Sequence, residues 1–507
     1  MEQAFEKLTR PQQLLAAMML ALANFIVVLD MTIANVSVPH IAGGLAVSPS
    51  QGTYVITSYA VAEAIIVPLT GWLAGRFGSV KVFVVSMLMF GICSALCGAA
   101  TSIEALVFFR ILQGLSGGPL MPISQALLIR IFPREKIGGA MALWSMTTLL
   151  APVLGPTLGG YISDNIGWEF IFFINVPIAI LCSLLVWRTL APVETETEKN
   201  RIDTVGLTLL IVWVAALQFM LDKGKELDWF ASPLIVSLAI TSAIGFAAFM
   251  IWELTADKPI VDLRIFRHRG FAMGTVTISL AFGSFFALNV LTPLWLQSYM
   301  GYTATDAGMV MGMNGMIAIF VAPFVARMLG KVDGRMLVFF GVMWLAGVTF
   351  WRSFYTTDVT FWQLAGPILV QGIGMPFFFI PLTNIALSSV QPKETASAAG
   401  LFNFVRTLSG AFATSLVTTA WENDANANHA QMVGDLDKYG DVQTTLVASG
   451  MTSDQAMVQL DHLLQGQAVM LANNHIFQVL VLCLIAAACS IWFAPKPTRV
   501  AKDMGGH

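Results

Sequence analysis

The feature that most constrains the fold of this chain is a series of apolar runs, each close to the length of a membrane-spanning helix. Such a helix needs roughly 20 consecutive apolar residues, and the runs are continuous, whereas a transmembrane β-barrel needs alternating strands. Only 11% of the 507 residues are charged, against about 25% in soluble domains. These observations predict an all-α polytopic membrane protein that resides in a lipid bilayer, with no nucleic-acid partner.

We predict fourteen transmembrane helices, joined mostly by short connections that are polar or contain Gly and Pro. Cytoplasmic loops of membrane proteins carry an excess of Lys and Arg. With a cytoplasmic N-terminus, most of the 27 basic residues fall on the cytoplasmic side. The exceptions are four on the outer side and two inside spans: Lys223, Lys225, Arg352 and Lys438, and Arg110 and Arg406. Both termini are therefore predicted to be cytoplasmic.

Two parts of the sequence resemble each other at a separation of about 258 residues. Gln113 in the fourth span matches Gln371 in the twelfth, each followed by Gly, and FPREK (132–136) matches QPKET (391–395) in the loops that follow. Parallel repeats of this kind are typical of transporters with a site between two halves. We predict two six-helix halves and two inserted helices, divided as 1–200, 201–260 and 261–507.

A single carboxylate, Asp30, lies inside the first apolar run, FIVVLDMTIANVSVP (25–39). A charge at the centre of a membrane helix costs roughly 2.5–3.5 kcal/mol even on a lenient scale, and such residues usually serve pathways or relays. The rise of 1.5 Å per residue places Arg110, in the fourth span, at a similar depth. We hypothesise that Arg110 pairs with Asp30 or tunes it, and that Asp30 exchanges a proton.

Several long stretches carry a family resemblance, among them LDMTIANVSVP (29–39), FFRILQGLSGGPLMPISQ (108–125) and FNFVRTLSGAFATS (402–415). They resemble the fourteen-span drug:proton antiporters of the major facilitator superfamily, most closely the EmrB-type multidrug efflux pumps. The resemblance covers essentially the whole chain. It implies a major facilitator fold in the bacterial inner membrane, proton-driven export of lipophilic or cationic drugs, and no enzymatic activity.

The sequence departs from the superfamily pattern in the second span and the loop after it. In GWLAGRFG (71–78), Gly75 stands where the superfamily usually has Asp, which puts the usual charge-relay gate in question. Glu63, near mid-depth, stands where the closest relatives tend to have an uncharged residue. It is either a second proton site or an anionic contact for cationic drugs.

Other polar residues inside the spans are candidates for function. Arg406 is a further intramembrane charge, while Asp222 and Glu253 lie at span ends, where each is either functional or simply solvated. Six amides are candidates for lining a substrate cavity: Gln113, Asn289, Asn314, Gln371, Asn384 and Asn403.

The fifth span contains APVLGPTLGG (151–160), with small residues every four positions. That spacing permits close helix packing. The spacing alone indicates ordinary packing, whereas the resemblance implies a tight contact between halves that favours antiport. The residues of this antiporter packing motif are Pro152, Gly155, Pro156, Gly159 and Gly160.

The longest non-membrane segment, 421–474, is predicted to lie outside the membrane and is rich in acidic residues. Its second half, DQAMVQLDHLLQGQAVMLA (454–472), has apolar residues at helical spacing. The segment is either a soluble external cap or a docking surface. The resemblance implies a periplasmic membrane-fusion adaptor and an outer-membrane channel as partners.

Neither a metal nor an organic cofactor is expected. The five cysteines all lie in apolar runs, as small buried side chains do, and their spacing does not indicate a metal site. The sequence has no Gly-x-x-x-x-Gly-Lys-[Ser/Thr] phosphate-binding motif, so the expected coupling ion is a proton.

Two other interpretations of the sequence remain beside multidrug export. Within transporters, the chain is alternatively a dedicated exporter of one compound or an uptake symporter. A non-transporting receptor or scaffold is disfavoured by the repeat and by the intramembrane charges.

Overall fold

The computed structural model describes residues 7–47, 49–197, 202–257, 259–329, 331–434 and 440–496. Regular structure in these ranges is entirely helical. The helices that precede residue 200 are called the N-half. They are α1 (Arg10–Gly44), α2 (Pro49–Gly52), α3 (Tyr54–Ile66), η1 (Val67–Leu69), α4 (Thr70–Phe77), α5 (Ser79–Gly98), α6 (Ile103–Gly117), α7 (Leu120–Ile131), α8 (Arg134–Asn165), α9 (Phe170–Phe173), α10 (Asn175–Leu190) and η2 (Ala191–Val193).

An inserted segment and the C-half follow. The inserted segment holds α11 (Thr204–Lys223), η3 (Trp229–Ala231) and α12 (Pro233–Thr255). The C-half holds η4 (Leu263–Arg267), α13 (Arg269–Tyr299), α14 (Ala304–Met328), α15 (Gly334–Arg352), α16 (Phe361–Ser388), η5 (Pro392–Glu394), α17 (Thr395–Gly434), α18 (Gly440–Ala448), α19 (Ser453–Ser490) and η7 (Ile491–Phe493).

Some helices start where the sequence supplies a capping side chain. The Ser102 hydroxyl accepts a hydrogen bond from the Ala105 amide at 3.3 Å at the start of α6. The Asp203 carboxylate accepts hydrogen bonds from two amides at the start of α11. Such caps satisfy amides that the first helical turn leaves unpaired. The apolar helices α6 and α11 therefore begin at polar positions.

Twelve helical segments within the described residues are long and apolar enough to cross a membrane. Where two helices continue into each other they count as one span, as α6 and α7 do over 103–131. The chain is therefore a multi-pass membrane protein. The long helices α8 and α17 are not among these twelve, so the predicted count of fourteen stays a prediction.

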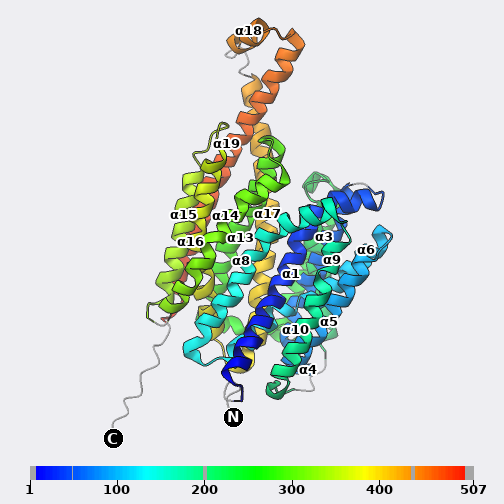
Figure 1. Cartoon of the computed structure of the whole chain (residues 1–507), viewed down its shortest axis with the longest axis vertical. Coiled ribbons are helices and arrows are strands. Elements are labelled where there is room, and N and C mark those ends of the chain that lie inside the picture. The colour runs from blue at the N-terminus through cyan, green and yellow to red at the C-terminus, as the bar shows by residue number, and fades with distance from the viewer. Residues whose placement is uncertain are drawn as a thin grey trace.

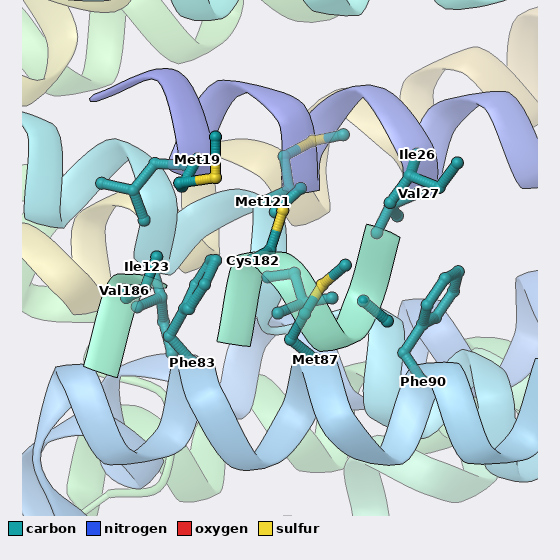
Figure 2. Close-up of a cluster of buried hydrophobic side chains, with 14 of the residues drawn as sticks. Met19, Ile26, Val27, Phe83, Met87, Phe90, Met121, Ile123, Cys182 and Val186 are labelled. Carbon is teal, nitrogen blue, oxygen red and sulfur yellow. The ribbon is translucent and has the colours of Figure 1, made fainter. Parts of the chain in front are cut away.

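The helices run side by side along the long axis of the molecule (Figure 1). The N-half has its own core, in which side chains of α1, α5 and α10 interlock, among them Ile26, Met87 and Val186 (Figure 2). Helix α8 packs against α1 and against α14 of the C-half, and α17 contacts α4, η1 and α7. The start of α1 and the C-terminal end of the last helices lie at one end of the bundle, called here the terminal end (Figure 1).

At the opposite end, α17 and α19 form a helical hairpin that projects beyond the bundle (Figure 1). The 40 residues of α17 give a length of about 60 Å at 1.5 Å per residue, roughly twice the bilayer core. The predicted helix in 454–472 is confirmed as part of α19. Both helices continue into the predicted non-membrane segment 421–474. In α17, no Gly or Pro interrupts the chain from Trp421 to Val433.

Candidate functional site

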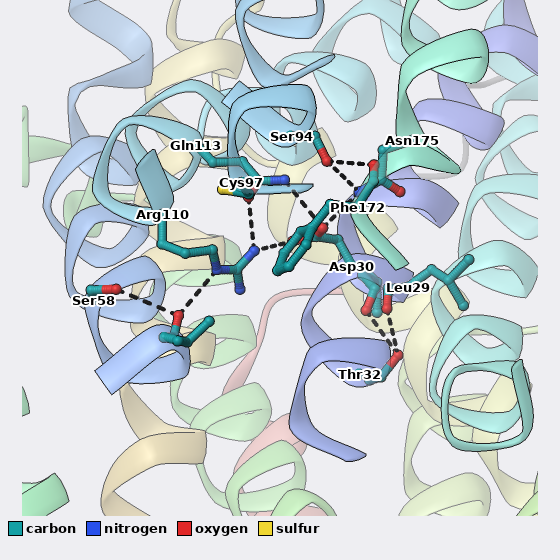
Figure 3. Close-up of polar contacts among 12 residues, drawn as sticks. Leu29, Asp30, Thr32, Ser58, Ser94, Cys97, Arg110, Gln113, Phe172 and Asn175 are labelled. Carbon is teal, nitrogen blue, oxygen red and sulfur yellow. Dashed lines mark hydrogen bonds and ion pairs between the residues drawn. The ribbon is translucent and has the colours of Figure 1, made fainter. Parts of the chain in front are cut away.

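The carboxylate of Asp30 lies at the centre of a buried hydrogen-bond network in the N-half (Figure 3). Arg110 Nη1 on α6 donates to Asp30 Oδ2 at 2.6 Å. Gln113 Nε2 and Asn175 Nδ2 both donate to Asp30 Oδ1, at 3.1 and 2.6 Å. The pairing of Arg110 with Asp30 is therefore the contact that their similar depths predict.

The guanidinium of Arg110 is held from several sides. Its Nε donates to the Val55 backbone carbonyl at 3.0 Å, and its Nη1 also donates to Gln113 Oε1 at 2.9 Å. The Tyr59 ring lies 4.3 Å from the guanidinium carbon, and such cation–π contacts are strengthened when they are desolvated. These contacts fix both the position and the orientation of the cation beside Asp30.

Two glycines bring α6 close enough to α3 for this arrangement. A Cβ at Gly114 would lie 2.5 Å from the Tyr59 backbone oxygen, and a Cβ at Gly117 would lie 2.7 Å from the Tyr59 hydroxyl. Only glycine permits that approach. The Arg110 side chain, one turn from Gly114, therefore reaches the Val55 carbonyl on α3.

A second layer of polar contacts extends the network across the N-half. Asn175 Nδ2 also donates to Ser94 Oγ at 2.9 Å, and Ser94 Oγ donates to the Phe172 carbonyl at 2.8 Å. Five helices, α1, α3, α5, α6 and α10, thus meet through one carboxylate and its partners. Because a buried ion pair is tolerated only when further hydrogen bonds compensate its desolvation, this arrangement keeps a charge deep in the bundle.

Glu63 and Arg406 are two further buried charges, and Arg406 lies at the boundary between the halves. Glu63 on α3 and Arg406 on α17 are both buried. Arg406 Nη2 donates to Met121 Sδ on α7 at 2.6 Å, and its guanidinium lies 5.3 Å from the centre of the Phe282 ring.

The two acids at span ends differ in their surroundings. Asp222 is exposed and interacts with the Thr57 side chain on α3. Glu253 is fully buried, and its Oε2 accepts a hydrogen bond from the Val261 amide at 3.1 Å. Glu253 therefore fixes the turn after α12.

The six amides predicted for a cavity lie in different settings. Gln113 and Gln371 each bind a buried arginine inside one half. Asn403 Nδ2 donates to Gln125 Oε1 at 2.7 Å across the boundary between the halves. Asn289 donates to a carbonyl of its own helix. Asn314 is buried on α14, and Asn384 on α16 is half-buried. A shared cavity for these six stays a prediction.

Arg352 is a buried charge that was not among the predicted site residues. It is the last residue of α15 and is 2% exposed, and its predicted place on the outer side stays a prediction. Its Nη2 donates to Thr292 Oγ1 at 2.6 Å, its Nη1 to Gln371 Oε1 at 3.2 Å, and the Phe477 ring lies 4.9 Å away. The repeat gave the available signal, because Gln371 matches Gln113, which binds Arg110.

Sequence comparison identifies the family to which these features belong. Residues 20–414 match the model of the Major Facilitator Superfamily. The chain belongs to the major facilitator superfamily. It is 43% identical over 500 residues to the multidrug export protein EmrB of Escherichia coli K12, covering 98% of each chain. It is 41% identical to the fatty acid resistance protein FarB of Neisseria gonorrhoeae, over 96% of this chain and 97% of that protein.

Solved structures of the major facilitator superfamily share the fold. The proton:xylose symporter XylE aligns with a TM-score of 0.61 at 14% identity, covering 96% of each chain. The human organic anion transporter MFSD10 aligns with a TM-score of 0.59 at 13% identity, covering 94% of this chain and 100% of that one. The predicted major facilitator fold is therefore confirmed, and the chain is a transporter rather than an enzyme.

The packing motif of this major facilitator chain lies on α8 and faces α1 of the same half. A Cβ at Gly155 would overlap the Thr32 side chain, and a Cβ at Gly159 would lie 3.0 Å from the Ile33 backbone oxygen. Gly160 has open space around it. Pro152 and Pro156 lie within the continuous helix α8. The close approach of α8 to α1 therefore depends on Gly155 and Gly159.

We expect Gly155→Val to destabilise the protein, because the larger side chain forces α8 away from Thr32 on α1. Overpacking of this kind typically costs about 1–3 kcal/mol. Gly160→Val is the matched control, since it adds the same side chain to the same helix in open space. Thermal unfolding in detergent measures both variants, and equal melting temperatures would contradict this packing role.

Proposed function

We propose that the chain is a proton-driven multidrug exporter of a bacterial inner membrane that works by alternating access. The observation that carries this proposal is the Asp30 carboxylate, buried in a transporter fold and held by Arg110, Gln113 and Asn175. Relatives such as EmrB are multidrug export proteins, which supports export of drugs. Lipophilic or cationic compounds are the proposed substrates.

In this mechanism Asp30 carries the coupling proton and Arg110 stabilises its ionised form. Protonation removes the negative charge of the Asp30 carboxylate. The carboxyl group then no longer accepts hydrogen bonds from Arg110, Gln113 and Asn175 together. The network then rearranges, which ties proton binding to helix packing. Glu63 is proposed as a second proton-coupling residue, and Asn403, at the boundary between halves, as a substrate contact.

The proton gradient is sufficient to drive export. A charge that crosses the membrane potential yields about 2.3 kcal/mol per 100 mV. A proton that moves down about 150 mV therefore supplies roughly 3.5 kcal/mol, or more than two decades of substrate concentration at about 1.4 kcal/mol each. In the proposed orientation, the terminal end is cytoplasmic and the hairpin end faces the periplasm.

Purified protein in liposomes tests the proposed function. We expect that a lipophilic cationic drug added to one side of the membrane causes protons to be released on that side in exchange. We also expect an imposed proton gradient to drive the drug against its own concentration gradient. Drug and proton moving in the same direction would indicate a symporter and overturn the proposal. Transport of one compound alone from a panel of unrelated drugs would indicate a dedicated exporter.

The hairpin of α17 and α19 is proposed to bind a periplasmic membrane-fusion adaptor, which would link the pump to an outer-membrane channel. Met457, Val458 and Leu463 of α19 are exposed on it, whereas Trp421 and Met470 pack in a shared core nearer the membrane. An exposed apolar surface on a polar projection is typical of an interaction site.

We expect replacement of residues 429–461 by a short Gly/Ser linker to weaken adaptor association at least about tenfold, or about 1.4 kcal/mol. His429 lies 2.9 Å from Asp461, so this replacement ends α17 and α19 at neighbouring positions. It leaves the core around Trp421 intact. Pull-down with the adaptor measures the effect, and drug binding by the shortened protein is the control. Unchanged association would reject docking at the hairpin.

A further inference from the structure

Arg352 is a buried cation of the C-half that no carboxylate side chain compensates. It is 2% exposed, and an arginine stays protonated in a folded protein. Within the described residues, no Asp or Glu forms an ion pair with it. Its two acceptors, the Thr292 hydroxyl and the Gln371 amide oxygen, are neutral. Because an uncompensated buried charge is costly, this cation needs a negative charge from another source.

The internal repeat shows which group the C-half lacks. In the N-half, Gln113 Oε1 accepts a hydrogen bond from Arg110, while Gln113 Nε2 donates to Asp30. In the C-half, the matching Gln371 accepts from Arg352 in the same way at 3.2 Å. Helix α13 is the counterpart of α1, and it contains no Asp or Glu. The C-half therefore keeps the pair of arginine and glutamine without the carboxylate that completes it in the N-half.

Hydrogen-bond donors without partners gather around Arg352. Arg352 Nε and the side-chain amide of Asn473 have no hydrogen-bond partner within the described residues. Asn473 is 1% exposed and lies one turn of α19 before Phe477, whose ring centre is 4.9 Å from the guanidinium carbon. The Tyr355 ring also packs on Phe477, and its hydroxyl has no partner among the described residues besides Arg352. Since buried donors are nearly always satisfied, these groups together can hold an acceptor.

Aromatic rings surround these donors and exclude water. Trp295 on α13 stacks on the Tyr355 ring, with the ring centres 6.3 Å apart. Thr292, Trp295 and Phe477 are each 1% exposed or less. Apolar surroundings strengthen the attraction between a cation and an anion, because the effective dielectric constant is low. The close packing favours a monatomic anion over a drug-sized molecule.

The C-terminal end of α15 balances the charge of Arg352 only in part. Arg352 is the last residue of that helix, and a helix C-terminus carries a partial charge of about half an elementary charge. Its Nη1 and Nη2 atoms donate to side chains of α16 and α13 rather than to the last carbonyls of α15. About half of the positive charge therefore remains to be balanced.

The site lies towards the hairpin end of the C-half. Helix α15 begins at the terminal end, where Arg335 Nη1 donates to the Ala494 carbonyl at 3.0 Å, and Arg352 is at its other end. Just beyond it, Gln467 Nε2 of the hairpin helix α19 donates to Thr357 Oγ1 at 2.9 Å. An anion therefore reaches Arg352 from the side on which the hairpin projects.

We propose that Arg352, Tyr355 and Asn473 form a binding site for a monatomic anion, with chloride as the occupant. The anion takes in the C-half the place that the buried carboxylate has in the N-half. Because the donors and their neighbours come from α13, α15, α16 and α19, the bound anion holds these four helices together near the hairpin end. This site is separate from the proposed proton and drug pathway, so it does not depend on the proposed function.

Thermal unfolding of the purified full chain in detergent tests the site. Sodium chloride replaces sodium gluconate stepwise, so that the ionic strength and its screening stay constant. An anion that binds only the folded protein stabilises it according to occupancy, so the unfolding equilibrium constant should fall about tenfold when chloride reaches about ten times its dissociation constant. The melting temperature is therefore expected to rise with chloride. Equal melting temperatures in the two salts would overturn the proposal.

Three variants locate the effect of chloride. Thr292→Asp places a carboxylate where the Thr292 hydroxyl accepts the hydrogen bond from Arg352 at 2.6 Å. We expect it to raise the melting temperature in gluconate and to abolish the response to chloride, because the new carboxylate balances the guanidinium. Arg352→Gln should lose the response as well, whereas Arg188→Gln removes an exposed cation and should keep it. A wild-type response to chloride in Thr292→Asp or in Arg352→Gln would mean that chloride acts elsewhere, and the site would be rejected.

Discussion

Asp30→Asn is expected to reduce drug-driven proton release in liposomes at least about 100-fold, or about 2.8 kcal/mol at 1.4 kcal/mol per decade. Asn matches the size of Asp, so the packing of α1 against α6 and α10 is retained. It lacks a titratable group, so no proton is bound at the position that Arg110, Gln113 and Asn175 surround. The measurement is proton flux per drug molecule transported.

Two comparisons make this result specific to the buried carboxylate. Asp164→Asn removes an exposed acid of the same half, which lies 2.9 Å from His40, and it should leave the proton flux unchanged. Equilibrium drug binding by Asp30→Asn should persist, because the substitution alters coupling rather than the fold. Normal proton release by Asp30→Asn would exclude Asp30 as the proton carrier and move that role to Glu63.

The sequence allowed the depth of each intramembrane charge to be predicted, but not the face of the helix on which it lies. Arg110 was matched to Asp30 because residue counting fixes the position along a helix. Gln113 was predicted to line a substrate cavity, and its hydrogen bond to Asp30 was not predicted. Core-facing and lipid-facing side chains are both apolar in a membrane helix, so hydrophobic periodicity does not distinguish the two faces.

Asn175 and Arg352 show the same limit of prediction from sequence. Asn175 begins α10 after a short interruption of the helix, and nothing near it in the sequence indicates that its amide lies 2.6 Å from Asp30. Arg352 ends α15, where a cation usually reaches solvent, but helices α13, α16 and α19 cover it. In both cases, the packing of helices distant in the sequence determines the surroundings.

The second large effect is expected for Arg110→Met, which should destabilise the folded protein by about 3–5 kcal/mol, as removal of one partner from a buried ion pair typically does. Met fills most of the space between Tyr59 and Phe172. It leaves the Asp30 carboxylate 98% or more buried with only two neutral amide donors. Unfolding in lipid–detergent mixtures by a chemical denaturant measures the loss.

The double variant Asp30→Asn with Arg110→Met separates the charge effect from the packing effect. With no carboxylate left to compensate, removal of the guanidinium costs its packing and its hydrogen bonds to the Val55 carbonyl and to Gln113 Oε1, but no ion pair. The double variant should therefore be more stable than Arg110→Met alone, and the non-additivity measures the coupling between the two residues. Arg188→Met, at an exposed position near the terminal end, is the control for loss of a cation. If the two substitutions prove additive, Asp30 and Arg110 are neighbours without energetic coupling, and a proton on Asp30 has no means of altering how α6 packs.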